Sequence, residues 1–228
     1  MNAIQISYEE ARNLMQPGDV IAFSGKGNIS ELVKMVTLAD VSHVGVILQS
    51  KVLDDDTGRF FNQIIESTTL KGCKGVKTSR LSDCLRAYEG EVWWLPLDKK
   101  IRECCFNQKE FYDFLFQQNG KPYDTLQAIN SAVDVLDWLG ATLNQEDFSK
   151  FFCSELVAAA FEQAGAVGPV NASEVTPIDL CRWRIYEDTY YQIQGDPRKS
   201  ISQFNTVSPS DWNIEGQQTG EGESVGLV

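Results

Sequence analysis

Two apolar segments on either side of an acidic turn constrain this fold more than any other feature of the sequence. SHVGVILQSK (42–51) and FFNQIIESTT (60–69) flank the turn-rich DDDTGR (54–59), which predicts a β-hairpin or two neighbouring strands. If the turn centres near Asp56, His43 lies opposite residues 66 to 69. Directly opposed residues share a face of the sheet, with Cβ atoms about 5 Å apart, so we expect Glu66 within hydrogen-bonding distance of the imidazole.

The remaining apolar patterns predict an α+β fold. They indicate further strands at 19–25 and 91–97, and helices at 8–15, 111–116 and 153–165. The last helix, CSELVAAAFEQAG, starts at Cys153 and has Gly165 in the position of a C-terminal cap. Cys153 is therefore expected in the first turn of a helix.

Length and charge limit the classes of function. A chain of 228 residues is long enough for one compact domain, which we assign to residues 1–212, with a helical insertion at about 125–140 and a disordered tail at 213–228. The net charge of −12 argues against nucleic acid and against an anionic membrane surface. No apolar run approaches the roughly 18 residues of a spanning helix, and the N-terminus lacks an export signal, so we expect a cytoplasmic chain.

The six cysteines show no disulfide framework spacing, and we predict that all of them are reduced thiols. A metal site is disfavoured because the chain has no CxxC pair and a single histidine. We therefore predict neither a metal nor another cofactor.

One thiol and one imidazole are candidates for covalent catalysis. A cysteine reacts as its thiolate, which a helix N-terminus and a neighbouring imidazolium both stabilise. Cys153 has the first by position, and His43 is the sole histidine that can supply the second. Each residue also has a simpler interpretation: Cys153 as a small apolar residue of a buried helix face, and His43 as an ordinary strand residue.

A family resemblance favours the catalytic interpretation. Gly120-Lys121-Pro122-Tyr123-Asp124, followed by Phe152-Cys153-Ser154-Glu155-Leu156-Val157, resembles the nucleophile motif of NlpC-type cysteine peptidases. PGDVIAFSG and VSHVGVIL precede that motif, and this order resembles the circularly permuted branch, which also includes enzymes related to lecithin:retinol acyltransferase. The likeness covers about residues 15 to 185. It implies a papain-like α+β fold, in which the helix that carries Cys153 packs against an antiparallel sheet.

The resemblance also implies roles for individual residues. Cys153 is the nucleophile, His43 the general base, and the polar group one strand later orients His43; Glu66 is the first choice there, with Ser67 and Thr68 as weaker candidates. Tyr123 corresponds to the family tyrosine that contacts a substrate carbonyl or oxyanion, although an ordinary core position is equally compatible with the sequence. The remaining predicted substrate-binding residues are Ser42 and Ser154.

The implied activity is acyl transfer through a thioester, with a peptide amide such as a cell-wall peptide as substrate. Because no export signal is visible, access to a cell wall would require lysis or a secretion machine. A lipid acyl hydrolase or acyltransferase is the alternative among enzymes, and a catalytically inactive binding module is the alternative outside them. An apolar tunnel would favour lipids, and a polar open groove would favour peptides.

Overall fold

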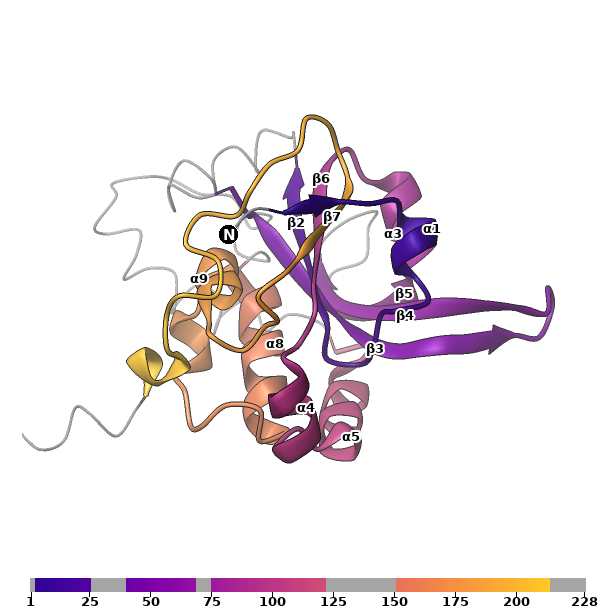
Figure 1. Cartoon of the computed structure of the whole chain (residues 1–228). Helices are drawn as coiled ribbons and strands as arrows, with labels where there is room; N and C mark the ends of the chain where they lie inside the picture. The colour runs from indigo at the N-terminus through magenta and orange to yellow at the C-terminus, as the bar shows by residue number, and fades with distance from the viewer. Residues whose placement is uncertain (1–2, 26–39, 69–74, 122–150, 214–228) are drawn as a thin grey trace, which may run out of the picture.

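The structure is a computed structural model that describes residues 3–25, 40–68, 75–121 and 151–213. Within these ranges the chain forms a seven-stranded sheet in the order β1-β7-β6-β2-β3-β4-β5, in which the β1–β7 pair is parallel and the other pairs are antiparallel (Figure 1). The strands are β1 (Ile4–Gln5), β2 (Val20–Gly25), β3 (His43–Asp54), β4 (Arg59–Thr68), β5 (Gly75–Arg80), β6 (Gly90–Leu95) and β7 (Tyr191–Gln194). The α+β class predicted from the sequence is confirmed.

Helices cover both faces of the sheet. α8 and α5 lie on one side, and the short helices α1 and α3 lie on the other (Figure 1). The helices are α1 (Tyr8–Ala11), α3 (Leu81–Ala87), α4 (Lys99–Cys104), α5 (Gln108–Gln118), α8 (Phe151–Gln163) and α9 (Pro177–Arg182), with 3₁₀ turns η2 (Ala172–Glu174) and η3 (Pro209–Trp212). None of the helices in the described ranges is long and apolar enough to cross a membrane.

Two apolar layers follow from the alternation of side chains along the strands. The residues of β2 illustrate the pattern: Val20 and Ala22 pack toward α8 and α5, whereas Ile21 and Phe23 pack toward α1 and α3. Neighbouring tryptophans on β6 are divided in the same way, since Trp93 joins the α8 side and Trp94 the opposite side. The sheet is thus covered on both faces, and its central strands β2 and β6 are almost entirely buried.

The hairpin predicted from the acidic turn is present as β3 and β4, and the pair extends beyond the rest of the sheet (Figure 1). Predicted strands at 19–25 and 91–97 correspond to β2 and β6, and the predicted helices at 111–116 and 153–165 correspond to α5 and α8. Asn107 caps α5 by accepting hydrogen bonds from the N–H groups of Lys109 and Glu110. Gly165 has a positive φ of 74°, as a glycine C-terminal cap requires.

The helix predicted at 8–15 is wrong in length, because α1 ends at Ala11. Continuing the helix would require the N–H of Gln16 to bond the carbonyl of Arg12. Instead, the Gln16 N–H donates to Asp19 Oδ2 at 2.9 Å, and the Arg12 carbonyl accepts from Asn62 Nδ2 at 2.8 Å. Tertiary partners on the loop and on β4 therefore end the helix early.

The prediction of six reduced thiols is also wrong, because Cys104 and Cys105 are joined by a disulfide. Adjacent cysteines need no framework spacing, and the short loop that they close adds little constraint on the unfolded chain. Cys84, Cys153 and Cys181 are thiols outside any disulfide. The predicted helical insertion at about 125–140 and the tail after Asn213 lie outside the described residues.

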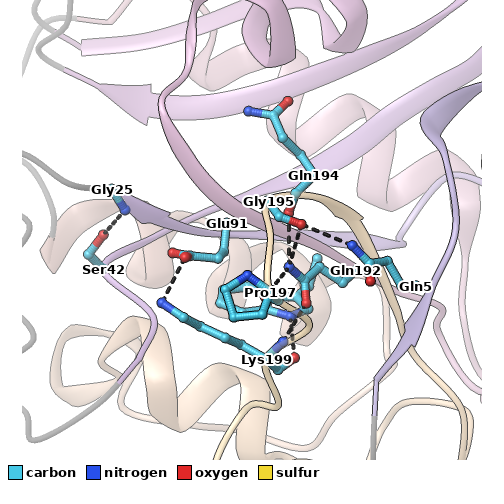
Figure 2. Close-up of polar contacts among 10 residues, drawn as sticks. Gln5, Gly25, Ser42, Glu91, Gln192, Gln194, Gly195, Pro197 and Lys199 are labelled. Carbon is cyan, nitrogen blue, oxygen red and sulfur yellow. Dashed lines mark hydrogen bonds and ion pairs between the residues drawn. The ribbon is translucent and has the colours of Figure 1, made fainter.

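The segment after β7 is fastened to the sheet by buried polar groups (Figure 2). The Gln192 amide is fully buried, accepts a hydrogen bond from the Lys199 N–H at 2.6 Å and donates to the Gly195 carbonyl at 3.0 Å. Lys199 Nζ forms an ion pair with Glu91 Oε1 of β6 at 2.7 Å. These contacts hold the segment from Gly195 to Lys199 against β6 and β7.

Candidate active site

The hairpin brings His43 and Glu66 together. His43 is the first residue of β3, and Glu66 lies two residues before the end of β4. Val46 pairs with Ile65 and Ile47 pairs with Ile64. Continuing this register along the two strands puts His43 opposite Thr68. Glu66 is then the diagonal neighbour of His43 on the same face, within reach of a long side chain.

His43 Nε2 lies 2.7 Å from Glu66 Oε2. The two side chains are 12% and 7% exposed, so little water competes for this contact. The Phe23 ring lies against the imidazole, with the ring centroids 5.4 Å apart. Glu66 and the Phe23 ring therefore both hold the imidazole in place.

Cys153 lies in the first turn of α8, and its side chain forms a hydrogen bond with His43. Because Nε2 already faces Glu66, the ring nitrogen available to the thiol is Nδ1. Burial lowers the pKa of His43, but the charge and hydrogen bond of Cys153, followed by those of Glu66, raise it from 6.5 to about 10. The site thus favours the imidazolium form of His43.

Glu66 stays ionised in this environment. Burial raises the pKa of its carboxyl, but the hydrogen bond and charge of His43, the charge of Lys77 and a hydrogen bond from Cys84 outweigh burial and leave that pKa below its usual value. An ionised Glu66 holds the proton on Nε2 and leaves Nδ1 to exchange a proton with sulfur.

The Cys153 side chain is fully buried. Burial on an apolar helix face is what the simpler interpretation predicts for this residue, since Val157 and Ala160 lie in the same apolar cluster. The hydrogen bond to His43 is not part of that interpretation. Contact between a thiol and an imidazole 110 residues apart in the chain is the feature that distinguishes the two readings.

The predicted substrate-binding serines are bonded to the protein backbone. Ser154 Oγ donates to the Val175 carbonyl at 2.5 Å, and Ser42 Oγ lies 3.3 Å from the Phe23 carbonyl, to which it donates. Both side chains are fully buried. Their contact with a substrate stays a prediction, whereas their observed contacts fix α8 and the start of β3. Tyr123 lies outside the described residues.

The two weaker candidates for the orienting role are also buried. Ser67 follows Glu66 on β4 and, by alternation, points to the opposite face of the sheet. Thr68 shares the face of Glu66, but it is Glu66 whose carboxylate contacts the imidazole.

A half-open pocket of about 210 Å³ lies beside His43 and Glu66, and the sequence did not indicate it. Its lining residues are Phe23, His43, Glu66, Lys77, Ser79, Asp83, Cys84, Ala87 and Tyr88. Most of them come from β5 and α3. Strand pairing identifies Phe23, which is directly opposite His43, but no local pattern identifies Cys84 on the seven-residue helix α3.

The described residues contain no group of three or more His, Cys, Asp or Glu side chains that could hold a metal ion. Asp19, another buried carboxylate, is bonded to Arg102 at 2.6 Å and to the Trp94 indole N–H at 2.8 Å. Its position between β2 and α4 indicates a structural role.

Comparisons with known proteins leave the family open. No protein-family model and no curated protein matches the chain. Among solved structures, the chain is similar to the metalloprotein yiiX from Escherichia coli O157:H7, with 18% sequence identity, a TM-score of 0.43, and coverage of 68% of this chain and 69% of that chain.

Proposed function

We propose that the chain is a papain-like cysteine hydrolase of the circularly permuted NlpC type, with Cys153 as nucleophile, His43 as base and Glu66 as the orienting residue. One observation carries the proposal: the sole histidine is hydrogen-bonded to a buried carboxylate on one side and to a helix-start thiol on the other. Nucleophile, base and orienter in contact are the signature of covalent catalysis. The packing of α8 on an antiparallel sheet supports a papain-like arrangement.

In the proposed reaction His43 holds the proton of the Cys153 thiol as an imidazolium, and the sulfur attacks the carbonyl carbon of an amide. A C–S bond forms, and the carbonyl electron pair moves to oxygen, where the N–H of Cys153 at the start of α8 is the expected donor. Collapse of this intermediate breaks the C–N bond, and the leaving amine takes the proton from His43. Water, deprotonated by His43, then attacks the thioester, and the released sulfur regains its proton.

A peptide amide is the proposed substrate class, rather than a lipid. The pocket beside His43 has a volume of about 210 Å³, smaller than the roughly 300 to 1,000 Å³ of pockets that enclose a drug-sized ligand. A cavity of this size next to the base can accept one side chain of a short peptide, such as those of bacterial cell walls, which supports the peptide class; Cys153 is not among its lining residues.

Alkylation by iodoacetamide at neutral pH tests the proposed nucleophile without knowledge of the substrate. We expect Cys153 to be carboxamidomethylated much faster than Cys84 and Cys181, because Cys153 is the one of these three with an imidazole partner. Cys84 and Cys181 are matched controls in the same chain, since burial raises the pKa of both thiols. Peptide mapping by mass spectrometry gives the rate at each residue.

His43→Ala should remove the preference for Cys153 while leaving the slow rates at Cys84 and Cys181 unchanged. Equal labelling of the three thiols in the wild-type protein would favour a binding module over an enzyme. A screen of γ-glutamyl-diaminopimelate peptides against lipid esters then tests the substrate class. Turnover of lipid esters alone would overturn the peptide assignment.

A further inference from the structure

The carboxylate of Glu66 has a second partner that the proposed reaction does not use. While Oε2 faces His43 Nε2, Oε1 accepts a hydrogen bond from Cys84 Sγ at 3.8 Å. Cys84 projects from α3, so the two oxygens of one carboxylate are bonded to residues of two different elements. A glutamate side chain has several rotatable bonds, and a contact on each oxygen fixes its orientation better than one contact does.

Cys84 is itself held in place by β5. Ser79 Oγ lies 3.0 Å from Cys84 Sγ. Because an ionised carboxylate only accepts hydrogen bonds, the Cys84 thiol must donate to Glu66, and the Ser79 hydroxyl is then the donor to sulfur. The contacts form a directed chain from Ser79 through Cys84 and Glu66 to His43.

The environment keeps the Cys84 thiol protonated, as a donor must be. Burial and the charge of Glu66 raise the pKa of this thiol to about 11, although Ser79 and Lys77 act in the opposite direction. Lys77 is the cross-strand partner of Glu66 on β5 and contributes its charge to the carboxylate. Two cysteines near one histidine thus have different chemistry: Cys153 faces the imidazole, and Cys84 faces the carboxylate behind it.

We propose that Cys84, held by Ser79, is a positioning residue that fixes the Glu66 carboxylate so that Oε2 faces His43 Nε2. This inference rests on the proposed function, because it assigns Cys84 a role in keeping His43 oriented toward Cys153. Cys84 acts through Glu66 and touches none of the reacting atoms.

The sole histidine makes the test direct, because NMR of the imidazole reports on one residue only. We would titrate His43 in the wild-type protein and in Cys84→Ala, Cys84→Ser and Ser82→Ala, and measure the iodoacetamide rate at Cys153 in each. Ser82→Ala is the matched control, since it removes a polar group from the same helix but does not line the pocket. Thermal unfolding shows that each variant is folded.

In Cys84→Ala we expect a lower pKa of His43 and a roughly tenfold slower alkylation of Cys153, as for other partners that orient a catalytic or ligating group. Cys84→Ser keeps a donor and should stay within about threefold of the wild type. Ser82→Ala should match the wild type.

The sign of the pKa change separates positioning from a purely electrostatic role. If the thiol only stabilised the charge of Glu66, removing it would make the carboxylate more basic and raise the pKa of His43. An unchanged or raised pKa in Cys84→Ala would therefore overturn the proposal. The histidine titration needs no turnover, so it gives this answer even if Cys153 is not selectively alkylated and the proposed function fails.

Discussion

Burial lowers the pKa of His43, whereas its neighbours Cys153 and Glu66 raise it, and the two neighbours outweigh burial. A paired charge in a poorly solvated site interacts more strongly than it would in water. Replacing Glu66 with glutamine changes this balance with least disturbance of the packing, because glutamine has nearly the same shape as glutamate and lacks its charge.

Glu66→Gln is expected to slow alkylation of Cys153 by iodoacetamide, or turnover once a substrate is known, by about 10- to 100-fold. Loss of the carboxylate removes the group that holds the proton on Nε2 and stabilises the imidazolium. Gln63→Glu, a charge change elsewhere on β4, is the control and should leave the rate unchanged. An unaltered rate in Glu66→Gln would exclude an orienting role for this residue.

The same pair predicts a pH dependence of stability. The folded-state pKa of His43 is above its ordinary value of 6.5, so its contribution to stability is complete below pH 6.5 and is lost as the pH rises toward about 10. The pKa of Glu66 is below its ordinary value of 4.5, so its contribution is present above pH 4.5 and is lost in more acidic solution. Urea denaturation should therefore show the largest stability difference between wild type and Glu66→Gln near pH 5 to 6, decreasing toward pH 10. A difference independent of pH would contradict this assignment.

The sequence predicts only part of this site, and the reason is separation along the chain. His43 and Glu66 belong to one hairpin, so alternation and turn position were sufficient to bring them together. Cys153 is on a distant helix, and its pairing with His43 came from the presence of a single histidine and from the family resemblance, and not from any local pattern. Cys84 and Ser79 were missed because their contacts depend on how α3 packs against β5.

Among the elements, the longest and most periodic were predicted, whereas the short strands β1 and β7 were not. β3, β4 and α8 each bury a regular apolar face, which is visible in the sequence. β1 and β7 have only two and four residues and mix polar with apolar side chains. Their extended conformation depends on pairing with each other and with β6, which is a tertiary effect.

One buried ion pair holds α4 against the start of β2. Arg102 donates to Asp19 at 2.6 Å, and Asp19 also accepts from the N–H groups of Gln16, Trp94 and Leu97. We expect Asp19→Ala to lower the free energy of unfolding by about 3 kcal/mol, because it leaves a partly buried guanidinium and three N–H groups without their acceptor. Urea denaturation measures this change. Lys109→Ala, which breaks an exposed pair with Asp113, is the control and should leave the midpoint unchanged.

Across the whole molecule, the first and the last strand of the described residues pair with each other in the sheet. β7 lies between β1 and β6, so a strand near the C-terminus joins the first strand to the sheet that carries His43 (Figure 1). The Gly195–Lys199 segment then folds back over β6, where Glu91 pairs with Lys199 Nζ (Figure 2). Trp93 Nε1 of β6 donates to the Lys199 carbonyl. The integrity of the sheet edge therefore depends on residues that are distant in sequence.

Gln192→Leu tests this dependence. The leucine keeps the buried volume approximately but leaves the Lys199 N–H without its acceptor, so we expect a loss of about 2 kcal/mol in the free energy of unfolding. Amide exchange should accelerate across residues 195–213, whereas the amides of β3 and β4 should remain protected, because their partners are elsewhere in the sheet. Gln5→Leu is the matched control, since the exposed Gln5 donates to the same Gly195 carbonyl but can be replaced there by water. Equal exchange rates in the two variants would mean that the buried amide does not fasten this segment, and that packing of Ile201 and Phe204 in the core does so instead.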